Sequence, residues 1–185
     1  VNGGTQNSVA DSLAVNNAQH GIVIRGASET YPLPNNRVEY NREDGVMVID
    51  MNGLLIEDNT VSNNLRTGLV VSKESGTSEG VVAQSNRVAG NWWHGIFYVQ
   101  SRDGSVVGNE VTGNLQDGIQ LHKSLNITLS QNNVTANRWE GIYFSYANSS
   151  LVVGNNIKEN SGGIQFELYS NDNNVTENNI EANNG

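Results

Sequence analysis

Six residues that could do chemistry occupy one repeated position in the sequence, directly before a glycine. They are His20, Asp44, Thr67, His94, Asp117 and Glu140. Histidine and carboxylate side chains exchange protons and hydrogen-bond to hydroxyl groups, so a cluster of them can bind a polar ligand or serve as acid and base. If successive repeats stack, His94, Asp117 and Glu140 should lie within a few ångströms of one another on one face.

A second column lies four positions after the same glycines. It contains Arg25, Ile49, Ser72, Val99, His122, Ser145 and Glu167, flanked by Lys123, Tyr143 and Tyr146. Together the two columns predict a polar groove with aromatic walls. The candidate ligand-binding residues are His94, Asp117, Gln120, His122, Lys123, Tyr143, Tyr146 and Glu167. The alternative is that these are ordinary outward residues on a solvated sheet face.

Other side chains suggest metal, sugar or modification sites. Asp117 and Glu140 offer the oxygen ligands that Ca²⁺ prefers, although that ion takes six to eight of them, so Ca²⁺ is a candidate and no other cofactor is expected. Trp92, Trp93 and Trp139 fall near one corner, where indoles can stack on sugar rings or pack against the protein. Glycosylation sequons begin at Asn126, Asn133, Asn148 and Asn174, and they have meaning only in an exported protein.

One repeat must position all these residues. The pattern Asn-x-(Val/Ile)-x-x-Asn begins at Asn36, Asn59, Asn86, Asn109, Asn132, Asn155 and Asn178. The starts are 23 residues apart except for one step of 27. A glycine and an aliphatic residue follow each of the first six copies. A degenerate earlier copy precedes the first, so roughly eight turns cover the chain.

The short alternating apolar runs within each repeat, such as 96–99, indicate strands. Three short strands with Asn and Gly corners fill 23 residues, which predicts an all-β, right-handed parallel β-helix. We expect the asparagines, including Asn41 to Asn183, to stack in corner columns and to take left-handed corner conformations. Ile96, Ile119, Ile142 and Ile164 should form an interior column.

Two segments depart from the period. Residues 27–35 hold both prolines, and residues 73–80 account for the long step, so both are expected to be loops projecting from the coil. No linker divides the chain, which predicts a single domain over residues 1–185. Its ends should be incomplete turns, left either by truncation of a longer protein or by a solenoid that assembles end to end.

Composition excludes several classes of protein. The 185 residues include 30 Asn and 20 Gly, which disfavours a helical bundle, and no window is apolar enough for a membrane span. A net charge of −9, with 10 Lys and Arg against 19 Asp and Glu, argues against nucleic-acid binding. The absence of Cys removes disulfides and thiolate chemistry and leaves the redox compartment undetermined.

The repeats resemble the parallel β-helix repeat family of the pectate-lyase-like superfamily. The first hundred or so residues are more specific, in the segments GGTQNSVA (3–10), NAQHG (17–21), GIVIRG (21–26), PLPNN (32–36) and NREDGV (41–46). These resemble the catalytic module of mannuronan (alginate) C5-epimerases. The family's Asp-Pro-His-Glu-like run is absent, because neither Pro32 nor Pro34 is followed by His. The chain therefore resembles rungs downstream of the catalytic motif, and no catalytic residue is assigned.

The resemblance implies an extracellular, cell-surface or periplasmic protein that binds a polysaccharide, with a polyuronate as one candidate. Epimerisation or lyase chemistry would need a group that neutralises the uronate carboxylate, a base and an acid, for which His122, Tyr143 and Lys123 are candidates. A polyanion near this acidic chain would also need local cations, and Arg25, Arg66, Arg102, Lys123 and Arg138 are scattered. The alternative is a structural or adhesive solenoid, such as a filament, stalk or surface-layer module.

Overall fold

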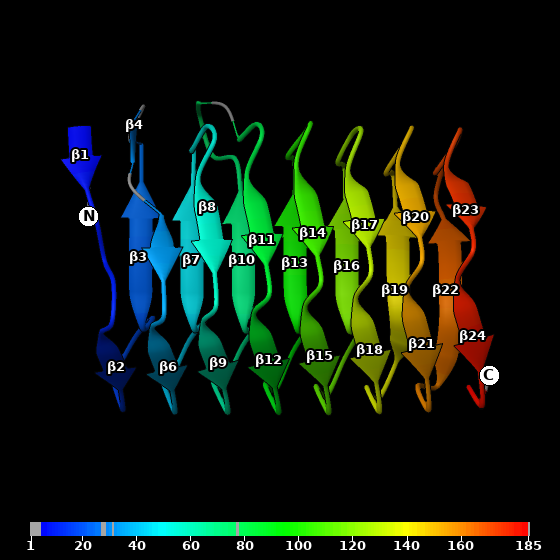
Figure 1. Cartoon of the computed structure of the whole chain (residues 1–185), viewed down its shortest axis with the longest axis horizontal. Helices are drawn as coiled ribbons and strands as arrows, with labels where there is room; N and C mark the ends of the chain where they lie inside the picture. The colour runs from blue at the N-terminus through cyan, green and yellow to red at the C-terminus, as the bar shows by residue number, and fades with distance from the viewer. Residues whose placement is uncertain (1–4, 27–28, 31, 77, 185) are drawn as a thin grey trace.

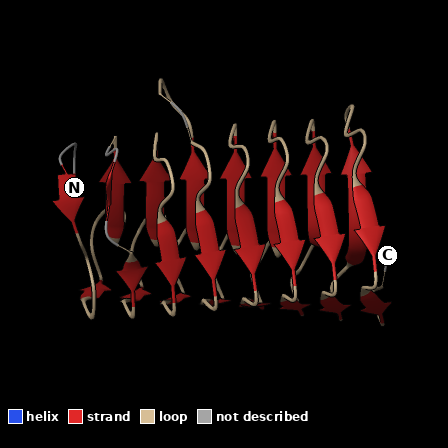
Figure 2. Ribbon diagram, turned by 45° about the horizontal axis from the view of Figure 1, so that its top comes forward, coloured by secondary structure: helices blue, strands red, loops and turns tan. Residues whose placement is uncertain are grey.

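The computed structural model describes residues 5–26, 29–30, 32–76 and 78–184, and these form a coil of parallel strands. Three sheets of seven, seven and eight strands run along the coil axis (Figure 1, Figure 2). Each turn contributes one strand to every sheet, which makes about seven turns. The predicted parallel β-helix is therefore confirmed. The described ranges hold no helix that could cross a membrane.

Sheet 1 carries the strands that follow the repeated glycines. It consists of β3 (Ile22–Arg25), β7 (Val46–Ile49), β10 (Leu69–Ser72), β13 (Ile96–Val99), β16 (Ile119–His122), β19 (Glu140–Ser145) and β22 (Gly162–Glu167). Every neighbouring pair is parallel and in register, as in Phe97 opposite Gln120 and Gln120 opposite Tyr143. Equivalent residues of successive repeats therefore lie side by side.

The other strands form two further sheets and a small pair. Sheet 2 consists of β5 (Leu33–Pro34), β8 (Leu55–Glu57), β11 (Val82–Gln84), β14 (Ser105–Val107), β17 (Thr128–Ser130), β20 (Leu151–Val153) and β23 (Asn174–Thr176). Sheet 3 consists of β2 (Leu13–Val15), β6 (Arg37–Glu39), β9 (Thr60–Ser62), β12 (Arg87–Ala89), β15 (Glu110–Thr112), β18 (Asn133–Thr135), β21 (Asn156–Lys158) and β24 (Asn179–Glu181). Outside the coil sheets, β1 (Thr5–Asn7) pairs with β4 (Glu29–Thr30).

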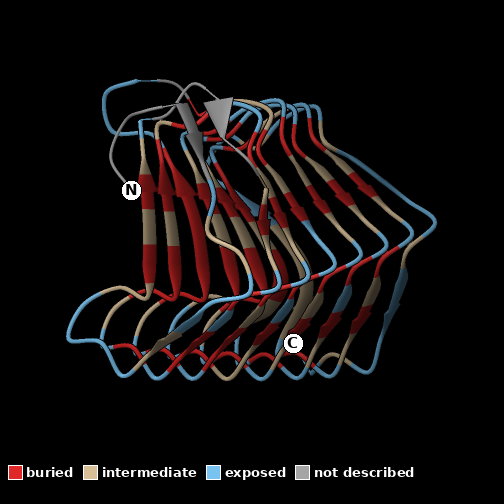
Figure 3. Ribbon diagram, turned by 60° about the vertical axis from the view of Figure 1, so that its left-hand side comes forward, coloured by how far each residue is buried: buried red, intermediate tan, exposed pale blue. Residues whose placement is uncertain are grey.

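The core lies inside the coil, where alternate residues of all three sheets meet (Figure 3). Ile96, Ile119 and Ile142 are fully buried and Ile164 packs against them, which confirms the predicted interior column. A second interior column runs through Tyr98, Leu121 and Phe144. Burial of these apolar side chains is the main force that holds successive turns together.

Two asparagine ladders fix the corners. In each ladder the side-chain amide nitrogen of one asparagine donates to the side-chain oxygen of the next, at 2.8–3.1 Å. The same oxygen accepts the backbone N–H of the preceding ladder residue, as when Asn109 accepts from Asn86 at 2.9 Å. The predicted stacking is confirmed.

The expectation that the ladder asparagines themselves take the left-handed conformation is wrong. The positive φ belongs to the residue directly before each of them, as at Asn35, Ser85 and Gly108. The ladder asparagine keeps a negative φ and directs its own N–H to the next turn. The sharp reversal of the chain therefore falls one residue earlier.

The repeated glycine is required by close contact rather than by φ. At Gly118 a Cβ atom would lie 2.4 Å from the Val134 methyl Cγ1 and 2.7 Å from the Gly141 carbonyl oxygen. The other glycines of this column, such as Gly95, meet equivalent neighbours. No side chain fits there, since such distances are below van der Waals contact.

Both predicted loops are shorter than expected. Leu33 is buried and pairs with Ile56 in sheet 2, so residues 33–35 belong to the coil, while Ala27, Ser28 and Tyr31 of that loop lie outside the described residues. In the second loop, Glu79 bridges Asn52 and Arg102 of neighbouring turns. The chain therefore returns to the coil by Ser78, which is buried. Both loops are short because the last residues of each segment are buried or paired with the backbone of a neighbouring turn.

Candidate functional site

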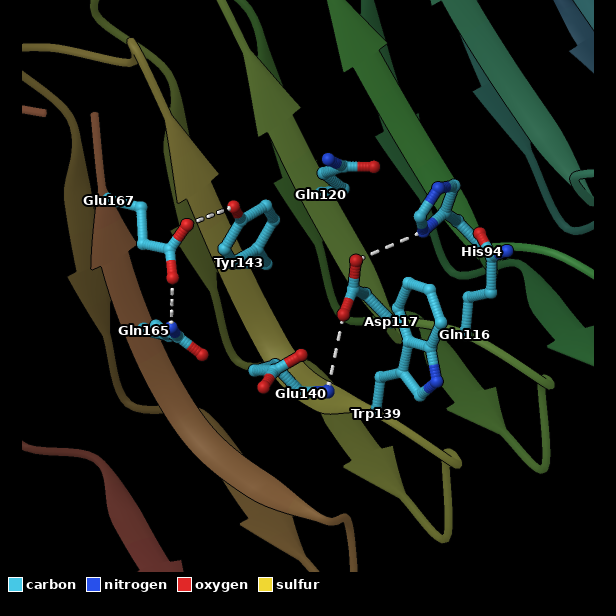
Figure 4. A pocket seen from close by; sticks show the side chains of 9 residues that line it. All are labelled: His94, Gln116, Asp117, Gln120, Trp139, Glu140, Tyr143, Gln165 and Glu167. Carbon is cyan, nitrogen blue, oxygen red and sulfur yellow. Dashed lines mark hydrogen bonds and ion pairs between the residues drawn. The ribbon is translucent and has the colours of Figure 1, made fainter. Parts of the chain in front are cut away.

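A hollow of about 370 Å³ lies on the outer face of sheet 1, where its later strands leave the corner with sheet 3 (Figure 4). It is lined by His94, Gln116, Asp117, Gln120, Trp139, Glu140, Tyr143, Gln165 and Glu167. Four consecutive turns contribute to it. Parallel in-register stacking places these residues, which are up to 73 positions apart in the sequence (167 minus 94), around one space.

The column before the glycines forms the corner side of the hollow. His94 Nδ1 lies 3.1 Å from Asp117 Oδ2, and Asp117 Oδ1 accepts the backbone N–H of Glu140 at 3.2 Å. The two atoms are close but not aligned as a hydrogen bond, and His94 Nδ1 has no hydrogen-bond partner among the described residues. The expected proximity of these three residues is therefore present in the structure.

Electrostatics raise the pKa of the third carboxyl in this column. Partial burial raises the pKa of Glu140, and closeness to the Asp117 carboxylate raises it further. Glu167 contributes in the same direction. Like charges therefore crowd this part of the hollow.

The opposite side is a tyrosine–carboxylate pair. The Tyr143 hydroxyl donates to Glu167 Oε2 at 2.8 Å, and Gln165 Nε2 donates to Glu167 Oε1 at 2.6 Å (Figure 4). Desolvation and the Glu167 carboxylate together raise the pKa of Tyr143 to about 12. Tyr143 consequently keeps its proton at neutral pH and acts as a donor, not as a base.

Five of the predicted residues meet at the hollow: His94, Asp117, Gln120, Tyr143 and Glu167. The side-chain oxygen of Gln120 is buried and has no hydrogen-bond partner in the described part of the chain. Whether these residues bind a ligand stays a prediction.

The other three predicted residues do not line the hollow. His122 ends β16 and its ring meets Tyr146 edge to face at 6.0 Å, while Lys123 follows in the turn. Desolvation and then the Lys123 charge lower the pKa of His122. Their column also fails to form a continuous polar groove, because Ile49, Ser72 and Ser145 are buried. Of the three groups considered for uronate chemistry, Tyr143 lines the hollow, whereas His122 and Lys123 lie outside it.

Four lining residues were absent from the predicted ligand-binding set: Gln116, Trp139, Glu140 and Gln165. Two of them had been considered in other roles, Glu140 as a Ca²⁺ ligand and Trp139 as a sugar-stacking indole. The register of the repeat was the signal that could have found them. Gln165 stands opposite Tyr143, and Glu140 belongs to the column before the glycines. Trp139 is 47% exposed, which favours the sugar-stacking alternative over burial in the core.

Most of the scattered arginines are paired with carboxylates elsewhere. Arg25 pairs with Glu74, and Arg102 Nη2 lies 2.8 Å from Glu79. Arg66 Nη2 lies 3.6 Å from Glu43. None of the nine residues that line the hollow is Lys or Arg.

The structure adds little to the predictions of a Ca²⁺ site and of glycosylation. Within the described ranges, no three His, Asp or Glu side chains are grouped as metal ligands. The Ca²⁺ site therefore stays a prediction. Asn126, Asn133 and Asn174 are exposed and Asn148 is half-buried. Use of these sequons stays untested.

Comparison with known families decides the classification. A profile described as "Right handed beta helix region" matches residues 1–103 and 75–185. The chain belongs to the right-handed β-helix family. This match supplies the handedness of the coil. Among curated proteins, none matches the chain.

Solved structures with the same fold include enzymes of polysaccharide chemistry. The periplasmic alginate epimerase AlgG is 18% identical with a TM-score of 0.75, over 95% of this chain and 47% of that one. The Azotobacter vinelandii mannuronan C-5 epimerase AlgE6 A-module is 17% identical with a TM-score of 0.71, over 96% and 59%. The bacteriophage CBA120 tailspike protein 2 enzymatically active domain is 11% identical with a TM-score of 0.59, over 94% and 38%.

At these low identities, the TM-scores show a shared β-helix fold and nothing more. The chain spans roughly two-fifths to three-fifths of the length of these three structures.

Proposed function

We propose that this β-helix binds a glycan in the hollow on sheet 1. The observation that carries the proposal is an exposed indole, Trp139, set beside carboxylate and amide groups in a single hollow of about 370 Å³. Aromatic faces pack against the C–H faces of sugar rings, while carboxylates and amides hydrogen-bond to their hydroxyls. Tyr143 adds a second aromatic ring and a hydroxyl that Glu167 holds in place.

The charge of the hollow favours a neutral or amino-bearing sugar over a uronate. Asp117, Glu140 and Glu167 contribute three carboxyls, and the lining residues include no Lys or Arg. A uronate would bring a further negative charge to a site where crowding already raises the pKa of Glu140. A polyuronate remains the alternative, which requires Lys123 or a bridging cation to screen the repulsion.

Binding without catalysis is the expected behaviour of this chain. It has no Asp-Pro-His run, and Tyr143 keeps its proton to a pKa of about 12. We expect no exchange of the C5 proton with solvent when the protein is incubated with polymannuronate. Exchange above the rate of a protein-free sample would contradict this.

The proposal puts the protein in an extracellular, cell-surface or periplasmic setting, where polysaccharides are met. Support comes from structural neighbours described as a periplasmic alginate epimerase and a bacteriophage tailspike domain. Those descriptions belong to the neighbours, and the location of this chain is part of the proposal.

The test is a titration with two series of oligosaccharides, neutral 1,4-linked β-gluco-oligosaccharides and oligomannuronates, at low and high salt. Chemical-shift changes and heats of binding are recorded for the parent, Trp139→Ala and Tyr143→Ala. Tyr40→Ala is the matched control, because Tyr40 is an exposed tyrosine that lies four turns away from Trp139 along the coil.

We expect weak binding, since an open hollow leaves much of a sugar hydrated. Loss of either ring should weaken it by about threefold to tenfold, the effect of one aromatic contact. Binding of the neutral series should be nearly independent of salt, whereas polyuronate binding through Lys123 should fall as salt is added. Absence of binding by both series would overturn the proposal and leave the structural solenoid as the better interpretation.

A further inference from the structure

Trp93 and Trp139 occupy the same position of the repeat, two turns apart, with Gln116 between them. The backbone connects all three, because Gln116 N donates to the Trp93 carbonyl at 3.2 Å and Trp139 N donates to the Gln116 carbonyl at 3.4 Å. Both indoles are exposed, Trp93 by 46% and Trp139 by 47%. Only Trp139 lines the hollow. Trp93 therefore extends the aromatic surface of the site along the coil axis.

The spacing of the two indoles follows from the stacking of the turns. Neighbouring parallel strands lie about 4.8 Å apart, so positions two turns apart are separated by about 10 Å. In an extended 1,4-linked β-glycan, alternate sugar rings present equivalent faces, and two pyranose units span a comparable length. A ring on Trp139 thus places the ring two units away beside Trp93.

An arginine of the preceding turn restrains the Trp93 side chain. The guanidinium carbon of Arg66 lies 5.6 Å from the centre of the Trp93 ring, and the Arg66 guanidinium is in turn 3.6 Å from Glu43. A cation at this distance is attracted to the indole face. The contact restrains an exposed side chain before any ligand arrives, which lowers the entropy that binding must overcome.

We propose that Trp93 is a second sugar-binding subsite and that the ligand is a linear, extended glycan lying parallel to the coil axis. The chain would pass over Gln116, whose side-chain amide can hydrogen-bond to hydroxyls of the unit between the two stacked rings. This inference rests on the proposed function of the hollow, and it adds the direction of the glycan and its minimum length. A trisaccharide is the shortest ligand that meets both indoles.

The test measures how affinity depends on ligand length. The parent, Trp93→Ala and Trp139→Ala are titrated with a disaccharide and a hexasaccharide of the neutral 1,4-linked β-gluco series and of the mannuronate series. Trp92→Ala is the matched control, since Trp92 is an adjacent exposed indole that belongs to a different column. Thermal melting of each variant verifies that the fold is retained.

The expected result is a difference between the two tryptophans. Trp139→Ala should weaken both ligand lengths, while Trp93→Ala should weaken the hexasaccharide by about threefold to tenfold and leave the disaccharide unchanged. Trp92→Ala should leave both unchanged. If Trp139→Ala weakens binding but Trp93→Ala does not, the second subsite is refuted and the proposed function stands. An equal loss in Trp92→Ala also refutes it. If neither series binds, both proposals are refuted.

Discussion

Replacing Asn109 by Ala removes one residue from the middle of an asparagine ladder. Its buried side-chain nitrogen donates to the Ala83 carbonyl at 2.9 Å, the Val107 carbonyl at 3.2 Å and the Asn132 side-chain oxygen at 3.0 Å. Its side-chain oxygen accepts the Asn86 backbone N–H at 2.9 Å and the Asn86 side-chain amide at 3.0 Å. One substitution therefore breaks five hydrogen bonds, and four of them join the turn of Asn109 to its two neighbouring turns.

The magnitude follows from the groups left without partners. The Asn86 backbone N–H is buried and loses its acceptor, which costs about 1–3 kcal/mol, and each lost bond to a carbonyl costs about 1 kcal/mol. Because Asn86 Nδ2 still donates to the Ile56 carbonyl at 2.8 Å, that group adds little. The sum is a loss of about 3–5 kcal/mol, or about 6–20 °C in melting temperature for a chain of this size.

Thermal and urea unfolding followed by circular dichroism measure this loss. The control is Asn133→Ala, an exposed asparagine whose side chain makes one surface contact, with Asn156. Its effect should stay below about 0.5 kcal/mol. If Asn109→Ala unfolds within 0.5 kcal/mol of the parent, roughly the error of the method, the ladder is not a source of stability and the reasoning fails.

Three further substitutions test other parts of the fold. Ile119→Asp buries a carboxylate with no cation in the core and should destabilise by about 4 kcal/mol or more, so melting like the parent would refute the inward assignment of Ile119. Gly118→Ala forces a Cβ atom to within 2.4 Å of Val134 and should cost more than Gly113→Ala, where φ is +64° but no atom lies within 4 Å; the reverse order would contradict the packing argument. Burial and the Asp117 carboxylate raise the pKa of Glu140 in the folded protein, which therefore favours the protonated carboxyl. The stability that this protonated carboxyl contributes is fully present below the unfolded pKa and is lost as pH rises through the folded pKa. Glu140→Gln should therefore melt higher than the parent at pH 7, with the difference vanishing near about pH 4, and equal melting at both pH values would show that Glu140 carries no such penalty.

Periodicity made the fold predictable. The recurrence of Asn, an aliphatic residue and Gly every 23 residues requires equivalent surroundings in every turn, and only a stacked coil supplies them. The interior isoleucines and both asparagine ladders could be assigned from spacing alone. The spacing of the repeat also predicted that His94 and Asp117 lie close together in adjacent turns, as the structure has them.

Local conformation was harder to predict than register. The left-handed residue precedes the ladder asparagine and is variously Asn, Asp, Ser, Gln, Glu, Tyr, Ala or Gly, so residue type gives no reliable signal for it. Leu33 was expected in a loop because its segment departs from the period of the repeat and holds both prolines, yet it is buried in sheet 2. The apolar side chain is stabilised by the core, and tertiary burial outweighs the local turn signal.

By itself, the sequence determined the architecture of this protein: strands, corners, interior columns and the list of polar residues that face outward. Only the tertiary structure decided which of those residues share one space, because an outward column is covered in some turns and open in others. Ile49 and Ser145 are buried in the column that also carries His122, whereas Tyr143 reaches Glu167 of the next turn and closes the hollow with Trp139. The repeat determines the backbone position from which each side chain extends. The length, direction and neighbours of the side chain determine where its polar atoms lie.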